Sequence, residues 1–555
     1  EDITTGDDNV AIGHDALKEN NTGSNNTACG YRALEKNTNG GTNVAFGNQA
    51  LRLNISGGTN VAIGYQALYN NTTGSNNTAF GRESLFTNTT TNDHTAIGHA
   101  ALYANTTGLD NTGIGCSALT ANTTGNYNVA VGHRALLANT TGGSNIAIGV
   151  AALSTQTTGG DNHVAIGHFA LAANTTGDNC VAVGYNALND NTTGGSNIAI
   201  GYNALAANTT GGENTAVGRN ALDANTTGQY NSAVGYNALT ASNTDYNTAI
   251  GYATLAAQTT GERNTAVGYG AGDAITTGAY NTGLGMSAMG GLTTGSYNTA
   301  VGQHALYNQN GASNNTAVGA NALGATTGQA NTGVGEGALE SNVAGQYNTA
   351  IGANSLDADT TGSKSVAIGY AALSTQNFTS ATDAHNVAVG YEAGKSVTTG
   401  VQNILVGALA GDAITTGNSN VSVGHGSLSL NTASHRNTAI GEFALANLNI
   451  TNSSNAYNTA LGYSAGAGVT TGTQNTLIGA LAGDALTDAD ENVAIGYGAL
   501  GADTKGSKSV AIGREALASQ NFTSATSPYN VAIGHAVDTN NLDRSITIGT
   551  DVTAI

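Results

Sequence analysis

The sequence predicts an all-β fold: a parallel β-solenoid of about 32 coils that spans residues 1–555 as one continuous repeat array. Three observations support this prediction. A 17-residue unit with the consensus NTAIGYxALxxNTTGxx recurs through the whole chain. Each unit contains one segment with the alternation of a strand and one with turn chemistry. Proline occurs once and charged residues make up only 9% of the chain, so no linker separates the units.

The segment that closes on glycine predicts the strand of each coil. Residues 60–64 read NVAIG, where a large residue alternates with a small one, which is the period of a strand with two different faces. Helical spacing is absent. The closing glycine recurs from Gly13 to Gly549, mostly at steps of 17. Residues 105–108 read NTTG and predict the turn, since glycine tolerates positive φ and Asn hydrogen-bonds to nearby backbone.

Stacking of such coils at about 4.8 Å predicts columns of equivalent side chains. Most coils carry Asn four residues before the closing glycine, and aligned amides in parallel strands form ladders. We therefore expect a structural Asn ladder that includes Asn197, Asn214, Asn231, Asn247, Asn264 and Asn281. Tyr residues predict two further columns, one directly after the closing glycine and one five residues before it.

The core of each coil is expected to be thin. A coil offers one Ile or Val, one Leu, a Thr or Val and two alanines, so the chain alone buries little apolar surface. Small Ala side chains on one face would let another chain approach closely. We therefore expect a homo-oligomer about the rod axis, with three chains as the expected number.

Residues 365–369 and 509–513 both read SVAIG, which resembles the core motif of the head repeats of YadA-like trimeric autotransporter adhesins. The fuller NTAIGYxAL and NTTG unit is similar to repeats in phage tail fibres and bacterial surface proteins. The resemblance implies a left-handed β-roll, trimeric assembly and a place on the surface of a cell or virion. The 17-residue unit is longer than the adhesin head unit.

A longer period appears within residues 363–549. The steps after Gly369, Gly441 and Gly513 are each 21 residues, and these glycines are 72 residues apart. The extra residues predict insertion loops at about 374–386, 446–458 and 518–530. Two interpretations stay open: an aromatic that folds over the core of a duplicated block, or a row of binding loops. For the second we name the candidate contact residues Phe378, Thr379, Asn449, Ile450, Phe522 and Thr523.

Composition argues against several classes of function. The net charge of −20 disfavours nucleic acid and anionic membranes as partners. No apolar run reaches the length of a membrane span, so we expect no direct membrane insertion. No cofactor, metal or catalytic constellation is expected: six His occupy the Tyr slot after the closing glycine, His94 and His163 replace ladder Asn, and the three cysteines fall in distant coils. Sequons such as that at Asn105 are explained by turn chemistry.

The leading functional hypothesis is a non-enzymatic extracellular fibre: a rigid trimeric shaft for attachment to a cell or host surface, as in a phage tail fibre or a bacterial adhesin. Its partners would be its own copies and a surface glycan or protein receptor. The alternative is a structural subunit of an end-to-end filament, because both ends of the sequence fall inside a repeat and carry no atypical capping unit. A third class, an ice or crystal binder, follows from the recurrence of Thr106, Thr123 and Thr140.

Overall fold

The computed structural model describes residues 5–308, 310–539 and 541–551. Over these residues the chain forms short strands and turns and contains no helix. The predicted parallel β-solenoid with a period near 17 residues is confirmed. The chain divides into two units, Glu1–Thr277 and Gly278–Ile555, and each is described by itself.

Nearly every strand is three residues long and belongs to one coil. The strands of the first unit are β1 (Val10–Ile12), β2 (Thr27–Cys29), β3 (Val44–Phe46), β4 (Val61–Ile63), β5 (Thr78–Phe80), β6 (Thr95–Ile97), β7 (Thr112–Ile114), β8 (Val129–Val131), β9 (Ile146–Ile148), β10 (Val164–Ile166), β11 (Val181–Val183), β12 (Ile198–Ile200), β13 (Thr215–Val217), β14 (Ser232–Val234), β15 (Thr248–Ile250) and β16 (Thr265–Val267).

The second unit repeats this arrangement with two extra two-residue strands, β22 and β24. Its strands are β17 (Thr282–Leu284), β18 (Thr299–Val301), β19 (Thr316–Val318), β20 (Thr332–Val334), β21 (Thr349–Ile351), β22 (Gly362–Ser363), β23 (Val366–Ile368), β24 (Thr382–Asp383), β25 (Val387–Val389), β26 (Ile404–Val406), β27 (Val421–Val423), β28 (Thr438–Ile440), β29 (Thr459–Leu461), β30 (Thr476–Ile478), β31 (Val493–Ile495), β32 (Val510–Ile512), β33 (Val531–Ile533) and β34 (Ile546–Ile548).

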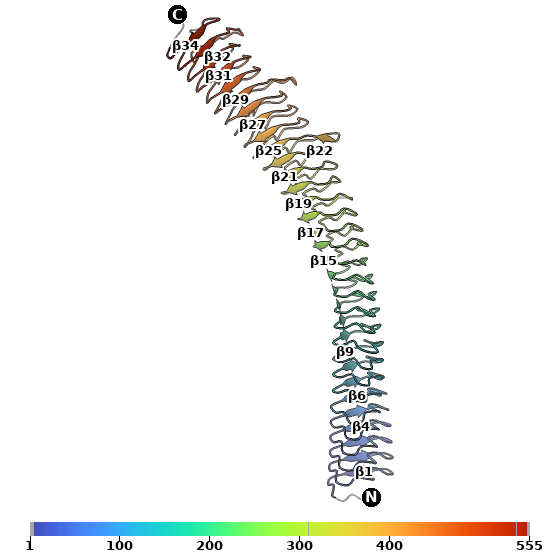
Figure 1. Cartoon of the computed structure of the whole chain (residues 1–555). Helices are drawn as coiled ribbons and strands as arrows, with labels where there is room; N and C mark the ends of the chain where they lie inside the picture. The colour runs from blue at the N-terminus through green and yellow to red at the C-terminus, as the bar shows by residue number, and fades with distance from the viewer. Residues whose placement is uncertain (1–4, 309, 540, 552–555) are drawn as a thin grey trace. The chain divides into compact units, whose positions relative to one another are not determined.

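Strands of successive coils pair in parallel and in register. Val61, Ala62 and Ile63 of β4 lie opposite Thr78, Ala79 and Phe80 of β5, one repeat further along the chain. The same one-repeat register joins β20 to β21 in the second unit. Figure 1 shows the strand arrows of neighbouring coils side by side along one wall of each unit. Chemically equivalent residues therefore form continuous columns.

Most strands point an Ala side chain inward, whereas the sequence predicted Ala on an outer face that another chain could approach. Ala62 is fully buried, whereas Val61 and Ile63 on either side of it are only half-buried. The small residue points into the coil because the interior is narrow, and the large β-branched residues point outward. Ala67 and Leu68 complete the apolar interior. The expected Ala face for a second chain is therefore wrong, since these alanines line the inside of the coil.

The closing glycine is required by the backbone. Gly64 has φ of +135°, and a Cβ placed there would lie 2.5 Å from the carbonyl oxygen of Gly81 in the next coil. A side chain at this position would collide with backbone, and L residues rarely adopt this φ. The closing glycine, which recurs in every repeat from Gly13 to Gly549, thus marks a very close approach between the backbones of successive coils.

In coils where the consensus Leu is missing, larger apolar side chains at neighbouring positions fill the interior. Gly394 and Gly411 replace that Leu, and a Cβ on either would lie within 2.8 Å of a methyl group of Leu405, which replaces the usual strand Ala. Val397 and Ile414, three residues after these glycines, are also fully buried in place of the turn Asn. Apolar volume lost at one position is replaced by its neighbours, as close packing requires.

The Asn column before the strand is buried and bonds mainly to backbone. The side-chain oxygen of Asn197 accepts the backbone N–H of Asn214 at 2.9 Å. The Asn197 amide donates to the Gly211 carbonyl at 2.8 Å. Asn231, Asn247 and Asn264 continue the pattern at 2.9–3.0 Å, and Asn281 donates to Gly295 in the second unit at 2.9 Å. The side chains of Asn197, Asn231, Asn247 and Asn281 thereby satisfy backbone groups that the narrow interior hides from water.

The Asn of the NTTG turn forms a second buried ladder. The Asn37 amide donates to the side-chain oxygen of Asn20 at 2.7 Å, and Asn54 donates to Asn37 at the same distance. Each amide also reaches the glycine carbonyl three residues later, as Asn37 does with Gly40 at 2.9 Å. Two polar ladders therefore run beside the small apolar core.

Candidate functional surface

Three outward positions do not follow the repeat: those two, five and six residues after the closing glycine. We call them the variable face. Its members include charged, aromatic, amide and glycine residues, whereas the inward columns are nearly uniform. Side chains that differ from coil to coil are free of the packing constraint on the inward columns, so this face is where recognition can be encoded. This face is not apparent from linear motifs, and alignment of the 17-residue units by column reveals it.

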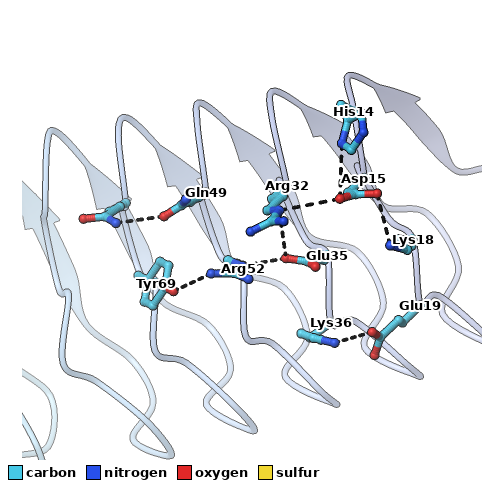
Figure 2. Close-up of polar contacts among 11 residues, drawn as sticks. His14, Asp15, Lys18, Glu19, Arg32, Glu35, Lys36, Gln49, Arg52 and Tyr69 are labelled. Atoms are coloured by element: carbon cyan, nitrogen blue, oxygen red, sulfur yellow. Dashed lines mark hydrogen bonds and ion pairs between the residues drawn. The ribbon is translucent and has the colours of Figure 1, made fainter.

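An ionic ladder occupies the variable face of the first coils (Figure 2). The Nε of Arg32 lies 3.5 Å from Asp15 and 3.9 Å from Glu35, and Arg52 Nε donates to Glu35 at 2.5 Å. Arg52 also donates to the Tyr69 hydroxyl at 2.7 Å. The hydrogen bond to Glu35 raises the pKa of the Arg52 guanidinium. The contacts of Arg32 with Asp15 and of Arg52 with Glu35 and Tyr69 link adjacent coils along the solenoid axis.

Beside this ladder, Lys18 lies 3.2 Å from Asp15, and Lys36 pairs with Glu19 of the preceding coil. Lys18, Glu19 and Lys36 are about half-exposed, so solvent screens these ion pairs and they contribute little to stability. The alternation of sign leaves little net field for steering a charged ligand.

Aromatic rings continue the same column. Phe86 stacks on Tyr69 at 5.4 Å between ring centroids and on Tyr103 at 5.1 Å, with interplanar angles of 14° and 4°. A ring stacked on both sides exposes its edge and hides its faces. Such a column stabilises neighbouring coils but offers a ligand no open ring face.

The Tyr column directly after the closing glycine is similarly closed. Tyr185 stacks on Tyr202 at 5.2 Å, and Tyr236 on Tyr252 at 5.2 Å. The guanidinium of Arg219 lies between the two pairs, 5.4 Å from the Tyr202 ring and 5.9 Å from the Tyr236 ring. These rings remain exposed at their edges. A ligand can therefore pack on a ring face of this column only where a stack is interrupted.

Surface hollows lie on or beside the variable face. One of about 160 Å³ is lined by His304, Tyr307, Asn308, Asn321, Gly324, Ala325 and Glu340. Another of about 300 Å³ is lined by Ser154, Thr155, Phe169, Ala172, Ala173 and Asn189. A third of about 390 Å³ is lined by Glu19, Lys36, Thr38, Leu53, Ile55 and Thr72. The first two form where Gly324 or Ala172 leaves the column unfilled between larger side chains.

The first insertion loop is anchored by its aromatic residue. Phe378 is only 5% exposed. Its ring lies over Gly362 of the preceding coil, where a Cβ would be 2.8 Å from the ring. Strand β24 of the loop pairs in parallel with β22 of that coil. The hydroxyl of Thr361 donates to the Phe378 carbonyl at 2.7 Å.

The other two loops attach in the same way. An isolated parallel bridge joins His435 to Asn455, and another joins Gly506 to Thr526. Ile450 is 8% exposed and Phe522 is half-buried. Of the six candidate contact residues, the side chains that face solvent are Thr379, Asn449 and Thr523. The structure therefore favours the interpretation that the apolar residues fold over the core, and a contact role for the exposed three stays a prediction.

His94 and His163 stand inside the Asn ladder. The Nδ1 atom of His94 accepts the backbone N–H of Asn111 at 3.1 Å, and that of His163 accepts the N–H of Cys180 at 3.1 Å. Burial lowers the pKa of both imidazoles. Among the described residues, no group of three or more His, Cys, Asp or Glu side chains could hold a metal ion.

The sequons and turn threonines are occupied by the fold. Asn105 and Asn122 are fully buried, and their amides donate to turn glycine carbonyls. Glycan attachment to these folded coils is therefore blocked. The hydroxyl of Thr106 donates to the Thr123 carbonyl, and that of Thr123 to the Thr140 carbonyl, both at 3.0 Å. These hydroxyls are committed to the next coil, which weakens the case for an ice-binding array.

In the part of the chain that the structure describes, no helix is long and apolar enough to cross a membrane. Comparison with known protein families finds no family model that matches this chain. Comparison with curated proteins likewise finds no match. Fold, columns and hollows are therefore the observations on which a functional assignment rests.

Proposed function

We propose that this chain forms the shaft of a non-enzymatic extracellular fibre in which three copies wind about a common axis, and that the fibre attaches to a cell or host surface. The single observation that carries the proposal is the outward column directly before the closing glycine. It is apolar in every coil, and it stays half-buried or exposed in the isolated chain.

The size of this column argues that it is covered. Phe46 and Phe80 are 57% and 51% exposed, and Ile148 and Ile200 in the same column are 38% and 40% exposed. Monomeric soluble proteins rarely expose contiguous apolar patches of more than a few hundred Å². Because every coil presents the same strip, copies related by rotation about an axis parallel to the solenoid would bury it along their whole length. Three copies and a left-handed coil follow the resemblance to the adhesin head repeats.

The mass of the native particle in solution tests the assembly. Light scattering should give three times the chain mass of 54.9 kDa. A stable particle with the mass of one chain would refute the proposal.

Cys29 tests which face meets the axis. It occupies the apolar outward column in β2, between Ile12 and Phe46 of the adjacent coils. Cys116 lies outside that column and is exposed. Mild oxidation should cross-link chains in the native protein and in Cys116→Ser, but not in Cys29→Ser, because a disulfide needs Cα atoms within about 7 Å. Cross-links that persist in Cys29→Ser would place another face at the axis.

A further inference from the structure

We propose that the hollow beside Tyr307 binds one neutral pyranose residue of a surface glycan. This inference rests on the proposed attachment function and supplies it with a receptor class and a site. The hollow lies wholly in the second unit, on the variable face, and holds about 160 Å³.

An interruption in an aromatic column produces the hollow. Five residues after successive closing glycines the chain carries Gly290, Tyr307, Gly324 and Glu340. The Tyr307 ring leans toward Gly290, where a Cβ would lie 2.9 Å from the ring. On its other side Gly324 provides no side chain, so no ring of the next coil stacks on Tyr307 in the way that Tyr103 stacks on Phe86.

The lining offers the two kinds of contact that a sugar requires. One face of a pyranose carries C–H groups that pack on an aromatic ring, and its rim carries hydroxyls that need polar partners. The Tyr307 ring supplies the first. His304, whose ring centroid lies 4.8 Å from that of Tyr307, supplies polar contacts together with the amides of Asn308 and Asn321 and the carboxylate of Glu340.

Charge selects among sugars. Glu340 lines the hollow, and Asp357 in the next coil is close enough for the Glu340 charge to act on it. Two carboxylates in a chain of net charge −20 repel sialic and uronic acids. A neutral sugar avoids this repulsion and can donate hydroxyl hydrogen bonds to Glu340.

Gly324→Phe is the sharpest perturbation. Its φ lies outside the left-handed region, so the backbone accepts a side chain. Phe86 occupies the equivalent position of another coil and stacks on Tyr69 there. The variant should therefore fill the hollow by restoring a stack that this fold already contains. Gly501→Phe is the matched control, because Gly501 holds the same column position and lies beside Asp484 instead of an aromatic ring.

Saturation-transfer NMR on the native chain and both variants tests the site, with the methyl glycosides of glucose, galactose, mannose and N-acetylglucosamine as probes and sialic acid as the acidic comparison. At least one neutral glycoside should give a signal with the native chain and with Gly501→Phe, at millimolar affinity, and that signal should fall to background with Gly324→Phe. Circular dichroism should show that both variants keep the native spectrum.

Three results would overturn the inference: no signal from any neutral glycoside, an equal signal with Gly324→Phe, or an equal signal from sialic acid. The particle mass is measured on the same samples. A monomer that still binds a glycoside at Tyr307 would refute the trimer and support the sugar site. A trimer that binds no glycoside would refute the sugar site and support the trimer.

Discussion

His94 provides a direct test of how the buried ladder stabilises the solenoid. It occupies the Asn column, where its own N–H donates to the Asn77 side-chain oxygen at 3.1 Å. Its Nδ1 accepts the Asn111 N–H at 3.1 Å, and its Nε2 lies 2.9 Å from the Thr91 hydroxyl. Acceptance at Nδ1 requires the neutral imidazole with its proton on Nε2. We predict that acid selectively loosens this coil and that His94→Asn removes the effect.

The magnitude follows from the contact that protonation destroys. A proton on Nδ1 would face the Asn111 N–H, which leaves that donor buried and unsatisfied at a cost of about 1–3 kcal/mol. Burial holds the pKa of His94 below its ordinary value of 6.5. The unfolded chain therefore binds more protons than the folded chain as the pH falls. This contribution to stability is complete above the unfolded pKa and is lost as the pH falls through the folded pKa.

Hydrogen exchange measured by mass spectrometry suits a solenoid, since each coil contacts only its neighbours and loosening is local. Peptides that cover β5–β7 should lose protection between about pH 8 and about pH 5, after correction for the intrinsic exchange rate, and His94→Asn should abolish that loss. Peptides of β3 and β4 serve as the internal control. An equal pH dependence in His94→Asn, or none in the native chain, would refute the reasoning.

Three further predictions follow from the packing. Leu255→Gly should destabilise the coil by about 3–5 kcal/mol. Adding Gln258→Ile should recover part of this loss, because Gly and Ile occupy these two positions in the next coil. Urea titration should therefore rank the native chain as most stable, the double variant second and the single variant last. Cys180 should resist thiol reagents in the native state while Cys116 reacts, because burial raises the pKa of the Cys180 thiol to about 11; equal rates in a thiol-labelling assay would contradict this. Phe378→Ala should release the first insertion loop, at a cost of about 3–5 kcal/mol for a buried Phe. Limited proteolysis should then cut the variant between residues 379 and 386. An unchanged digestion pattern would show that the ring does not anchor the loop.

The repeat alone predicts much of this fold. Coil length, parallel pairing and the buried Asn column follow from a fixed period with strand alternation. The repeat does not predict which face of each strand points into the coil, because alternation shows only that the two faces differ. Whether Ala62 or Ile63 points inward depends on the interior width, which is set by the tight packing around Gly64 and its neighbours in the stack.

The variable face was harder to predict for a different reason. Its features arise from pairs of residues in different coils, such as Glu35 with Arg52 or Tyr307 with Gly324. Each of these residues looks unremarkable within its own repeat. The contact or hollow exists only because stacking brings positions one repeat apart to about 4.8 Å. A column-wise comparison of the repeats contains this information, and a search for linear motifs does not.

The backbone hydrogen bonds between coils also determine how the shaft responds to force. They run along the solenoid axis, so a pull on one end of a unit loads the outermost coil first while its neighbours keep their pairing. That coil would peel away whole and release 17 residues, or about 60 Å of extended chain. A tether built this way lengthens in equal increments under strain, and the coils that have not yet peeled keep their surfaces intact.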